Sequence, residues 1–195
     1  MDASGETVTE ARRSEAELVE ELRAGSHDAL TDLFDRYGDR IHTHCFRQLG
    51  SWHEAEDATA TVFLEVWRHR ARVLEHDGSA LPWLFGVATN VCRNLNRSSR
   101  RRLRMVGRLP DPEPVPDHAA LVSEQLDAEV RMRQVLAAIE QLPAHERDVL
   151  ALVAWAGLTY EQAAAALAVP VGTVRSRLSR ARKRLALPDP EGEAS

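Results

Sequence analysis

The sequence predicts an all-α protein of two small helical domains joined by a proline-rich linker. Apolar residues recur at three- and four-residue spacing over most of the chain, and no stretch alternates apolar and polar residues over the length of a strand. Ser or Thr with Glu or Gln three residues later precedes three of these patterns, the signature of a capped helix start. Residues 106–119 hold four of the nine prolines, and proline alternating with acid favours an extended linker.

The first predicted domain covers residues 14–105. Ser14 with Glu17, and Ser51 with Glu54, form two of the capping boxes. Helices are expected over 14–24, 27–49 and 52–73, with a fourth from Pro82, where a first-turn proline is tolerated. The residues expected to face the core at helical spacing are Leu18, Val19, Leu22, Leu30, Leu33, Phe34, Tyr37, Ile41, Cys45, Leu49, Ala55, Ala58, Val62, Phe63, Val66, Trp67, Leu84, Val87, Ala88, Val91 and Leu95.

The second predicted domain covers residues 120–187 and holds four helices. Its last two helices form a distinctive stretch, 158–185. Thr159 and Gln162 cap a short helix, Pro170 prevents it from continuing, and a strongly basic helix follows. This pattern is typical of a helix-turn-helix, whose second helix enters the DNA major groove. The alternative is a solvated basic helix without a ligand.

Positive charge is concentrated in two short segments. The chain of 195 residues has a net charge of −5, but residues 93–108 contain seven arginines and no acid, and residues 175–184 contain six bases and no acid. The rest of the chain carries 12 bases and all 30 acids. Because that acidic remainder would repel a polyanion, we expect nucleic acid to bind at two separate basic sites.

Composition argues against several classes of protein. The apolar stretches are shorter than the 18–20 residues that span a bilayer, so no membrane insertion is expected. Cys45 and Cys92 show no pairing pattern, which suits a reducing cytoplasm. His42 and His44 do not share a helix face, and no common catalytic motif occurs. We therefore predict a cytoplasmic protein that is not an enzyme and needs no metal or cofactor. Residues 1–13 and 188–195 lack periodicity and are predicted to be disordered.

This organisation resembles the bacterial RNA polymerase sigma factors of the sigma-70 family, extracytoplasmic-function (ECF, group 4) type. VPVGTVRSR at 169–177 is typical of the recognition helix of sigma region 4, and 142–168 resembles the rest of that region. Residues 55–67 and 82–102 resemble two parts of sigma region 2. The resemblance extends from residue 15 to residue 186, and identifies 14–105 with region 2 and 120–187 with region 4.

The resemblance implies a non-catalytic subunit that binds core RNA polymerase, recognises the −10 and −35 promoter elements and directs promoter opening. Its partners would be the β′ clamp helices and the β flap of the polymerase, duplex promoter DNA and the melted non-template strand. An anti-sigma factor, which holds many relatives inactive, is a hypothetical further partner. The protein would work in the bacterial cytoplasm, at the nucleoid when active.

Site residues follow from the same resemblance. A helix with acidic and aromatic residues would dock on the polymerase, and the helix that carries Asn90 would capture a base flipped from the −10 element. The predicted polymerase-binding residues are Glu54, Glu56, Asp57, Phe63 and Trp67. The predicted −10 residues are Asn90, Arg93, Asn94, Arg97, Arg100 and Arg101. The predicted −35 residues are Thr173, Arg175, Ser176, Arg177, Ser179, Arg180, Arg182 and Lys183.

The chain departs from the family pattern at four of these positions or their neighbours. Ala58 and Ala60 replace the usual leucine and glutamine, Asn94 replaces the usual aspartate, and Ser179 stands where relatives often have a bulky residue. The promoter sequence is therefore not transferable from relatives. A rival hypothesis is a dimeric helix-turn-helix regulator that binds its operator without polymerase, which would leave the first domain without a role.

Overall fold

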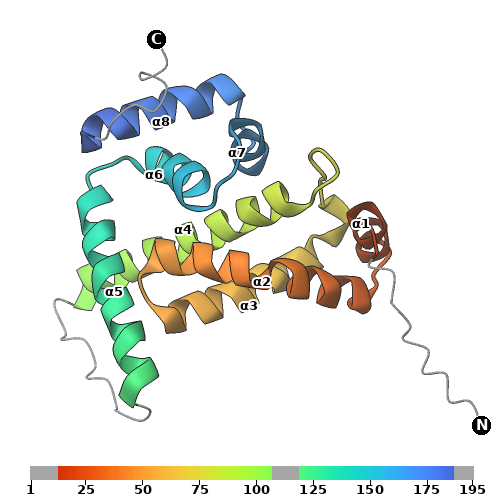
Figure 1. Cartoon of the computed structure of the whole chain (residues 1–195), viewed down its shortest axis with the longest axis horizontal. Helices are drawn as coiled ribbons and strands as arrows, with labels where there is room; N and C mark the ends of the chain where they lie inside the picture. The colour runs from red at the N-terminus through yellow and green to blue at the C-terminus, as the bar shows by residue number, and fades with distance from the viewer. Residues whose placement is uncertain (1–12, 107–118, 187–195) are drawn as a thin grey trace, which may run out of the picture.

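The computed structural model describes residues 13–106 and 119–186, and within these ranges it contains no strand (Figure 1). The all-α class is confirmed. The predicted linker and both terminal segments lie almost entirely outside the described residues. The elements are α1 (Glu15–Arg23), α2 (His27–Leu49), α3 (Trp52–Arg68), the 3₁₀ turn η1 (Arg70–Arg72), α4 (Leu81–Val106), α5 (Ala119–Ile139), α6 (Ala144–Leu150), the π-helical turn η2 (Ala151–Trp155), α7 (Tyr160–Leu167) and α8 (Val171–Leu185).

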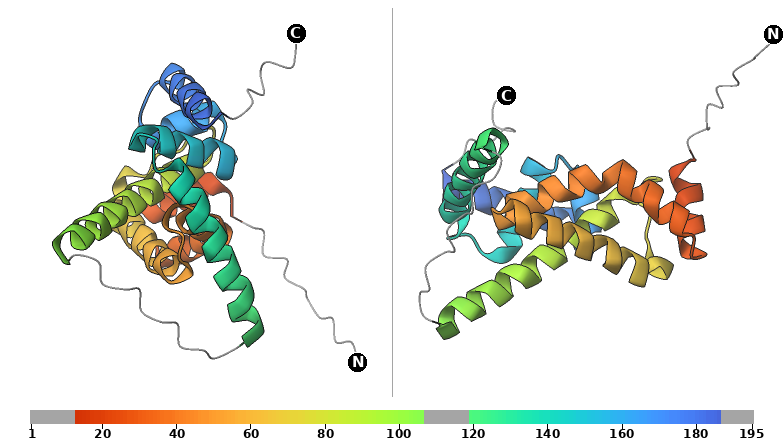
Figure 2. Two further views of the ribbon diagram at one scale, coloured as in Figure 1. Left: turned by 90° about the vertical axis from the view of Figure 1, so that its left-hand side faces the viewer. Right: turned by 90° about the horizontal axis from the view of Figure 1, so that it is seen from below.

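The helices form two groups that touch. Helices α1 to α4 pack as a bundle, and α6, α7 and α8 lie against one side of it, while α5 crosses the end of the bundle to reach them (Figures 1 and 2). Helix α7 contacts both α4 and α8, and η2 contacts α2. The basic helix α8 is therefore separated from the bundle by the layer of α6 and α7. No helix in the described part of the chain is long and apolar enough to cross a membrane.

Helix boundaries follow the local chemistry with one clear exception. Helix α3 ends at Arg68, so the helix predicted to reach residue 73 is too long. One long-range contact and one local contact favour the turn that replaces its last residues. Val73 is buried, its carbonyl oxygen accepts a 2.7 Å hydrogen bond from Arg23, and the guanidinium of Arg70 lies 4.5 Å from the centre of the Trp67 ring. These contacts need the chain to turn back toward α1.

The predicted core is correct at most positions. Leu33, Ile41, Val62 and Leu84 are fully buried, as expected. Phe34 was expected to be inside but is 48% exposed, and Leu95 is 36% exposed. Phe34 lies at the edge of the apolar face of α2, where it packs edge to face on Phe63 at a centroid distance of 4.9 Å. Helical spacing alone does not distinguish this border position from the core.

Helix α7 begins with a complete capping box. The Oγ1 atom of Thr159 accepts a 3.1 Å bond from the backbone N–H of Gln162, and the Gln162 side chain accepts a 3.1 Å bond from the Thr159 N–H. We expect Thr159→Ala to lower the free energy of unfolding by about 1 kcal/mol, because two N-terminal donors lose their partners. Urea denaturation followed by circular dichroism measures this change. Thr159→Ser, which keeps the hydroxyl, is the control; equal loss in both variants would contradict the capping role.

We expect His44 to make the stability of the bundle dependent on pH. Its ring is buried, with Nε2 3.1 Å from Thr89 Oγ1 and 2.6 Å from Gln48 Nε2, and burial, helped by Arg47, lowers its pKa from 6.5 to about 3. Between pH 6.5 and 3, His44 is therefore protonated in the unfolded chain but stays neutral in the folded chain. The free energy of unfolding falls as the pH is lowered through this range. We expect a loss of about 1 kcal/mol between pH 7 and 5.5.

Urea denaturation at a series of pH values tests this expectation. His44→Gln keeps hydrogen-bonding capacity but has no proton to gain, so its stability should change less over the same range. The comparison uses the pH slope and not the absolute stability, because the substitution also alters packing. Parallel slopes for the two proteins would rule His44 out as the source.

Candidate nucleic-acid interface

Helix α8 packs on α6 and α7 through one apolar face, and its other faces are accessible to solvent to different degrees. Val174, Leu178 and Ala181 are buried against α6 and α7, at the spacing of one helix face. Proline at position 170 precedes the first turn, and Ala168, at the end of α7, adopts a left-handed conformation with a φ of 52°. These residues produce the tight turn between α7 and α8. The predicted helix-turn-helix is thus present in the structure (Figure 1).

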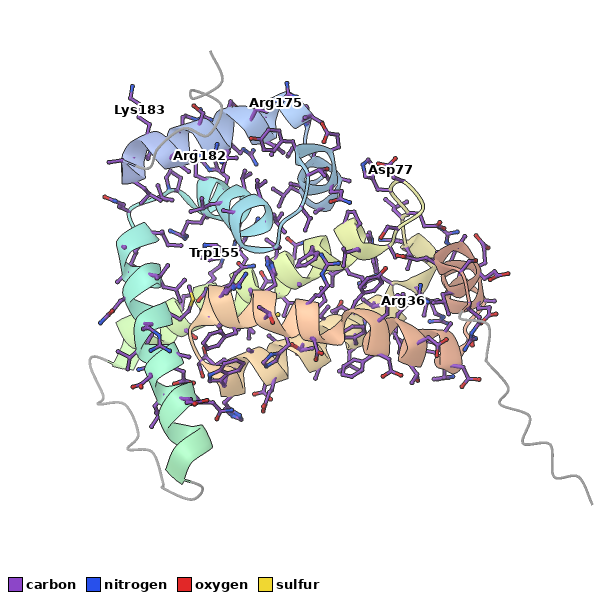
Figure 3. The ribbon with its side chains drawn as sticks, in the orientation of Figure 1. Arg36, Asp77, Trp155, Arg175, Arg182 and Lys183 are labelled. Carbon is purple, nitrogen blue, oxygen red and sulfur yellow. The ribbon has the colours of Figure 1, made fainter. Side chains whose placement is uncertain are left out.

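The eight residues predicted on α8 do not share one environment. Arg175 and Lys183 are exposed and point away from the body of the protein, whereas Arg182 lies toward α6 (Figure 3). Ser176 and Ser179 are also exposed. The outward set is therefore Arg175, Ser176, Ser179 and Lys183, and the half-buried set is Thr173, Arg177 and Arg182. Only the outward set is presented directly to a ligand on the outer face of α8.

Arg180 is exposed but forms an ion pair with Glu146. Glu146 of α6 is 2% exposed, and its carboxylate lies 3.7 Å from Nε of Arg180 and 3.2 Å from Nε of Arg184. The two arginines keep more than half of their side-chain surface in solvent. This carboxylate joins α6 to one side of α8 beside the buried apolar face of Val174, Leu178 and Ala181. Residue spacing could not reveal Glu146, because its partners lie about 35 positions away in the chain.

Helix α4 carries the second basic segment. Asn90, Asn94, Arg97 and Arg101 are exposed, while the side chain of Arg100 lies outside the described residues. Arg93 differs from them because it forms an ion pair with Asp148 of α6. Burial raises the pKa of Asp148, and the guanidinium groups around it, that of Arg93 first, act in the opposite direction. Of the described −10 candidates on α4, Arg93 is the one that meets an acid of the second helical group.

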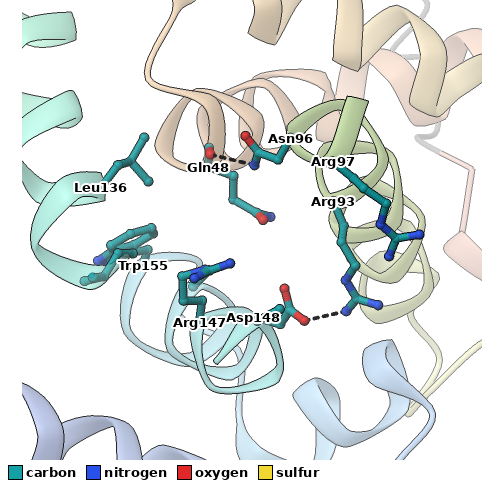
Figure 4. A pocket seen from close by; sticks show the side chains of 11 residues that line it. Gln48, Arg93, Asn96, Arg97, Leu136, Arg147, Asp148 and Trp155 are labelled. Atoms are coloured by element: carbon teal, nitrogen blue, oxygen red, sulfur yellow. Dashed lines mark hydrogen bonds and ion pairs between the residues drawn. The ribbon is translucent and has the colours of Figure 1, made fainter. Parts of the chain in front are cut away.

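A cavity of about 210 Å³ lies between the two helical groups, beside this ion pair (Figure 4). Arg93 and Arg97 of α4 line one side, and Asp148 and Trp155 line the other. Gln48 lies on the α2 side of the cavity, where its backbone carbonyl oxygen accepts a 3.3 Å hydrogen bond from the side-chain amide of Asn96. The described residues thus place the basic face of α4 opposite Arg147, Asp148 and Trp155 of the second group.

Comparison with known proteins agrees with this organisation. Residues 33–102 match the family model of sigma-70 region 2, and residues 132–185 match that of sigma-70 region 4. The chain is 31% identical to the ECF RNA polymerase sigma factor SigM of Mycobacterium tuberculosis over 174 residues, which cover 89% of this chain and 84% of SigM. The chain belongs to the ECF RNA polymerase sigma factors. It is therefore a sigma factor, which recognises promoters and directs RNA polymerase to initiate transcription.

Other relatives vary in length. This sigma factor is 27% identical to SigW of Bacillus subtilis, with 86% of this chain and 92% of SigW covered. It is 33% identical to SigE of Mycolicibacterium smegmatis, with 79% of this chain covered but only 59% of SigE. Among solved structures, CnrH in complex with the cytosolic domain of CnrY has a TM-score of 0.64 at 22% identity, covering 89% of this chain and 96% of that one. That likeness supports the fold.

The predicted polymerase-binding residues of this sigma factor lie on or near α3. Glu54, Glu56 and Asp57 are exposed at its start, and Trp67 is half-buried against His27. Phe63 is only 6% exposed, so little of its ring is accessible in this structure, and its contact with the polymerase stays a prediction. Phe34 packs edge to face on Phe63 and is the more exposed of the two rings, at 48%.

Sequence reasoning missed a second apolar residue on this surface, Leu64, which is 66% exposed. Its place among otherwise polar positions on the outer side of α3 could have revealed it. Leu64 and Phe34 are both large exposed apolar residues, and Leu64 shares α3 with the exposed acids Glu56 and Asp57. We refer to Phe34, Glu56, Asp57 and Leu64 as the α3 surface.

Proposed function

We propose that this sigma factor reads the −35 element with α8, captures the −10 element with α4 and docks on core polymerase through the α3 surface. The observation that supports this division is the exposure of two basic helices in segments matching region 4 and region 2, with Arg175 outward on one and Asn90 on the other. The boundaries of the two domains, 14–105 and 120–187, and the linker between them remain predictions.

The outward set of α8 has the chemistry of a major-groove reader. Arginine can bond bidentately to guanine, and serine can bond to a base edge or to phosphate. Arg180, held by Glu146, lies beside the outward set and would contact phosphate. Arg177 and Arg182 are half-buried, so we assign them to the packing and charge of region 4, and no longer to base reading.

Helix α4 has the chemistry of a single-strand binder. The Asn90 amide can bond to the edge of an unstacked base, and the arginines that follow it provide a basic track for phosphates. Arg97 and Arg101 are exposed and available for this role. Arg93 would join them once its ion pair with Asp148 opens. Asn94 is exposed one turn after Asn90, where the family's aspartate usually stands.

The α3 surface would meet the clamp helices of the β′ subunit. Its acids supply long-range attraction to a basic partner, and Phe34 and Leu64 supply apolar area that polymerase would cover. The region 4 domain would contact the β flap. We further propose that the protein acts in the cytoplasm as a non-catalytic subunit.

Leu64→Asp tests the docking surface. We expect it to weaken binding to purified bacterial core RNA polymerase at least about tenfold, roughly 1.4 kcal/mol, because it places a carboxylate in an apolar contact. Leu74→Asp is a matched control, since Leu74 is 67% exposed but lies in the loop after η1. Fluorescence anisotropy of labelled protein gives both dissociation constants. Equal weakening by the two substitutions, or none, would contradict the assignment of this surface.

An anti-sigma factor remains a hypothesis for this chain. Many ECF sigma factors are held inactive by such a protein, and α5 exposes the apolar side chains of Leu126 and Val130, one turn apart on the same side of the helix. Affinity purification from uninduced cells tests the hypothesis. Recovery of the sigma factor without a stoichiometric inhibitor under every uninduced condition would contradict it.

A further inference from the structure

The cavity between the two helical groups carries an excess of positive charge. Among the described residues that line it, the charged ones are Arg93 and Arg97 of α4 and Arg147 and Asp148 of α6 (Figure 4). Three guanidinium groups therefore share this space with a single carboxylate. Because like charges around a partly enclosed space are screened only weakly by water, an anion inside the cavity would lower the free energy of the protein.

The ion pair with Asp148 does not use all the donors of Arg93. It involves Nη2, whereas Nε of Arg93 is buried and forms no hydrogen bond with any described residue. A buried donor without an acceptor is unfavourable. An anion bound beside Arg93 would supply an acceptor at this end of the cavity.

Arg147 and Arg97 contribute their charges in different ways. Nη1 of Arg147 donates hydrogen bonds to the backbone carbonyl oxygens of Glu140 at 3.1 Å and Leu142 at 2.6 Å. These bonds hold the guanidinium at the end of α5 without neutralising it, because carbonyl oxygens carry no net charge. Arg97 is exposed and forms no ion pair with a described residue. The cavity thus combines one arginine held in position with one that can turn toward a ligand.

We propose that this cavity binds a small diphosphate anion, held by Arg93, Arg97 and Arg147. Arginine binds phosphate through paired N–H donors, and the excess of two positive charges favours an anion with several negative charges. The cavity volume, about 210 Å³, is several times the roughly 30 Å³ of a water molecule, so there is room for two linked phosphate groups. Trp155 lines the same cavity and would add a stacking surface if the diphosphate belongs to a nucleotide.

A bound diphosphate would also affect promoter binding. Arg93 and Arg97 are predicted to hold −10 phosphates, so the anion would compete with the −10 strand for these two side chains. This consequence rests on the proposed role of α4, whereas the diphosphate site itself does not. Arg147 belongs to the cavity but not to the predicted DNA contacts, which allows the two kinds of site to be separated.

Isothermal titration of the full chain with pyrophosphate tests the site directly. We expect saturable binding to the wild-type protein, and Arg97→Gln should weaken it at least about tenfold, because a charge-assisted hydrogen-bond donor is lost. Arg97 is exposed, so this variant should fold normally. Arg101→Gln is the matched control: Arg101 is exposed one turn later on α4 but does not line the cavity. Absence of saturable binding, or equal weakening by the two variants, would overturn the proposal.

A second pair of measurements separates the cavity from a general basic surface. Arg147→Gln should weaken pyrophosphate binding at least about tenfold but change the affinity for a short fluorescein-labelled single-stranded DNA less than about twofold. Arg101→Gln should do the reverse. Parallel losses of both ligands in both variants would show one diffuse basic surface and contradict a separate site. If neither variant alters DNA binding while Arg147→Gln loses pyrophosphate, the −10 assignment fails and the diphosphate site stands.

Three further ligands identify the source of the diphosphate. ADP that binds as tightly as pyrophosphate would assign the site to the diphosphate group alone. ADP that binds about fivefold more tightly or better, with the gain lost in Trp155→Leu, would assign it to a nucleotide, because base stacking supplies that difference. Adenosine, which has no phosphate, should not bind, and sodium chloride at equal ionic strength should not displace pyrophosphate completely. Adenosine binding as tightly as ADP, or complete displacement by the salt, would contradict recognition of the diphosphate.

Discussion

Replacing Arg175 by alanine is expected to weaken binding of polymerase holoenzyme to a cognate −35 element by about 1–3 kcal/mol, five- to roughly 150-fold. Arg175 is exposed on the outer side of α8, and its guanidinium carbon lies 5.7 Å from the centre of the Tyr160 ring. The ring restricts the arginine without burying it, so its fork is available to a base. Electrophoretic mobility shifts with promoters mutated base by base measure the loss.

Two comparisons separate base reading from phosphate binding. Arg175→Lys keeps the charge but loses the bidentate fork, so it should lose discrimination at one base pair while retaining much of the non-specific affinity. Lys183→Ala, at the other end of the exposed face, should weaken all promoters about equally and reduce the salt dependence of binding. Uniform weakening of every promoter by Arg175→Ala would leave Arg175 as a phosphate contact only.

Asn90→Ala is expected to impair promoter opening far more than initial duplex binding. Asn90 is exposed on α4, and its amide can bond to a flipped base but has no partner in a closed duplex. Unstacking a base costs a few kcal/mol, so losing its receptor should slow opening or reduce the open fraction about tenfold or more. Permanganate reactivity of −10 thymines at a series of temperatures measures opening, and a mobility shift at low temperature measures initial binding.

Asn96→Ala provides the control for this substitution. Asn96 is also exposed on α4, but its amide bonds to the Gln48 carbonyl oxygen at 3.3 Å, and it is not among the predicted −10 residues. We expect it to leave opening almost unchanged. An equal loss in binding and opening for Asn90→Ala would exclude base capture, and an equal loss in both variants would indicate general damage to α4.

Local sequence signals predicted the elements well because short-range chemistry sets them. The Thr159 and Gln162 capping box and the break at Pro170 are local, and both appear in the structure as expected. The predicted end of α3 was wrong because the long-range hydrogen bond from Arg23 to the Val73 carbonyl oxygen favours a turn there. Phe34 was placed inside because helical spacing gives the side of a helix but not the edge of the covered area.

Among the site residues, too, features set by the local sequence were predictable and features set by contacts between distant residues were not. Exposure of Asn90 and Arg175 follows from their positions relative to the apolar face of each helix, and it was predictable. The ion pair of Arg93 with Asp148 and the carboxylate of Glu146 beneath α8 join residues 34 to 55 positions apart. Such pairs depend on how helices pack, which neither periodicity nor motif spacing specifies. The burial of Phe63 beside Phe34 depends on the same information.

The most direct test of the account is reconstitution of the full chain with purified bacterial core RNA polymerase on a library of randomised promoters. We predict run-off transcripts that start at defined sites only when both proteins are present. The selected templates should share two elements, one weakened by Arg175→Ala and the other by Asn90→Ala. A protein that starts no transcripts with core enzyme, yet footprints duplex DNA alone as a dimer, would contradict the assignment and support a conventional helix-turn-helix regulator.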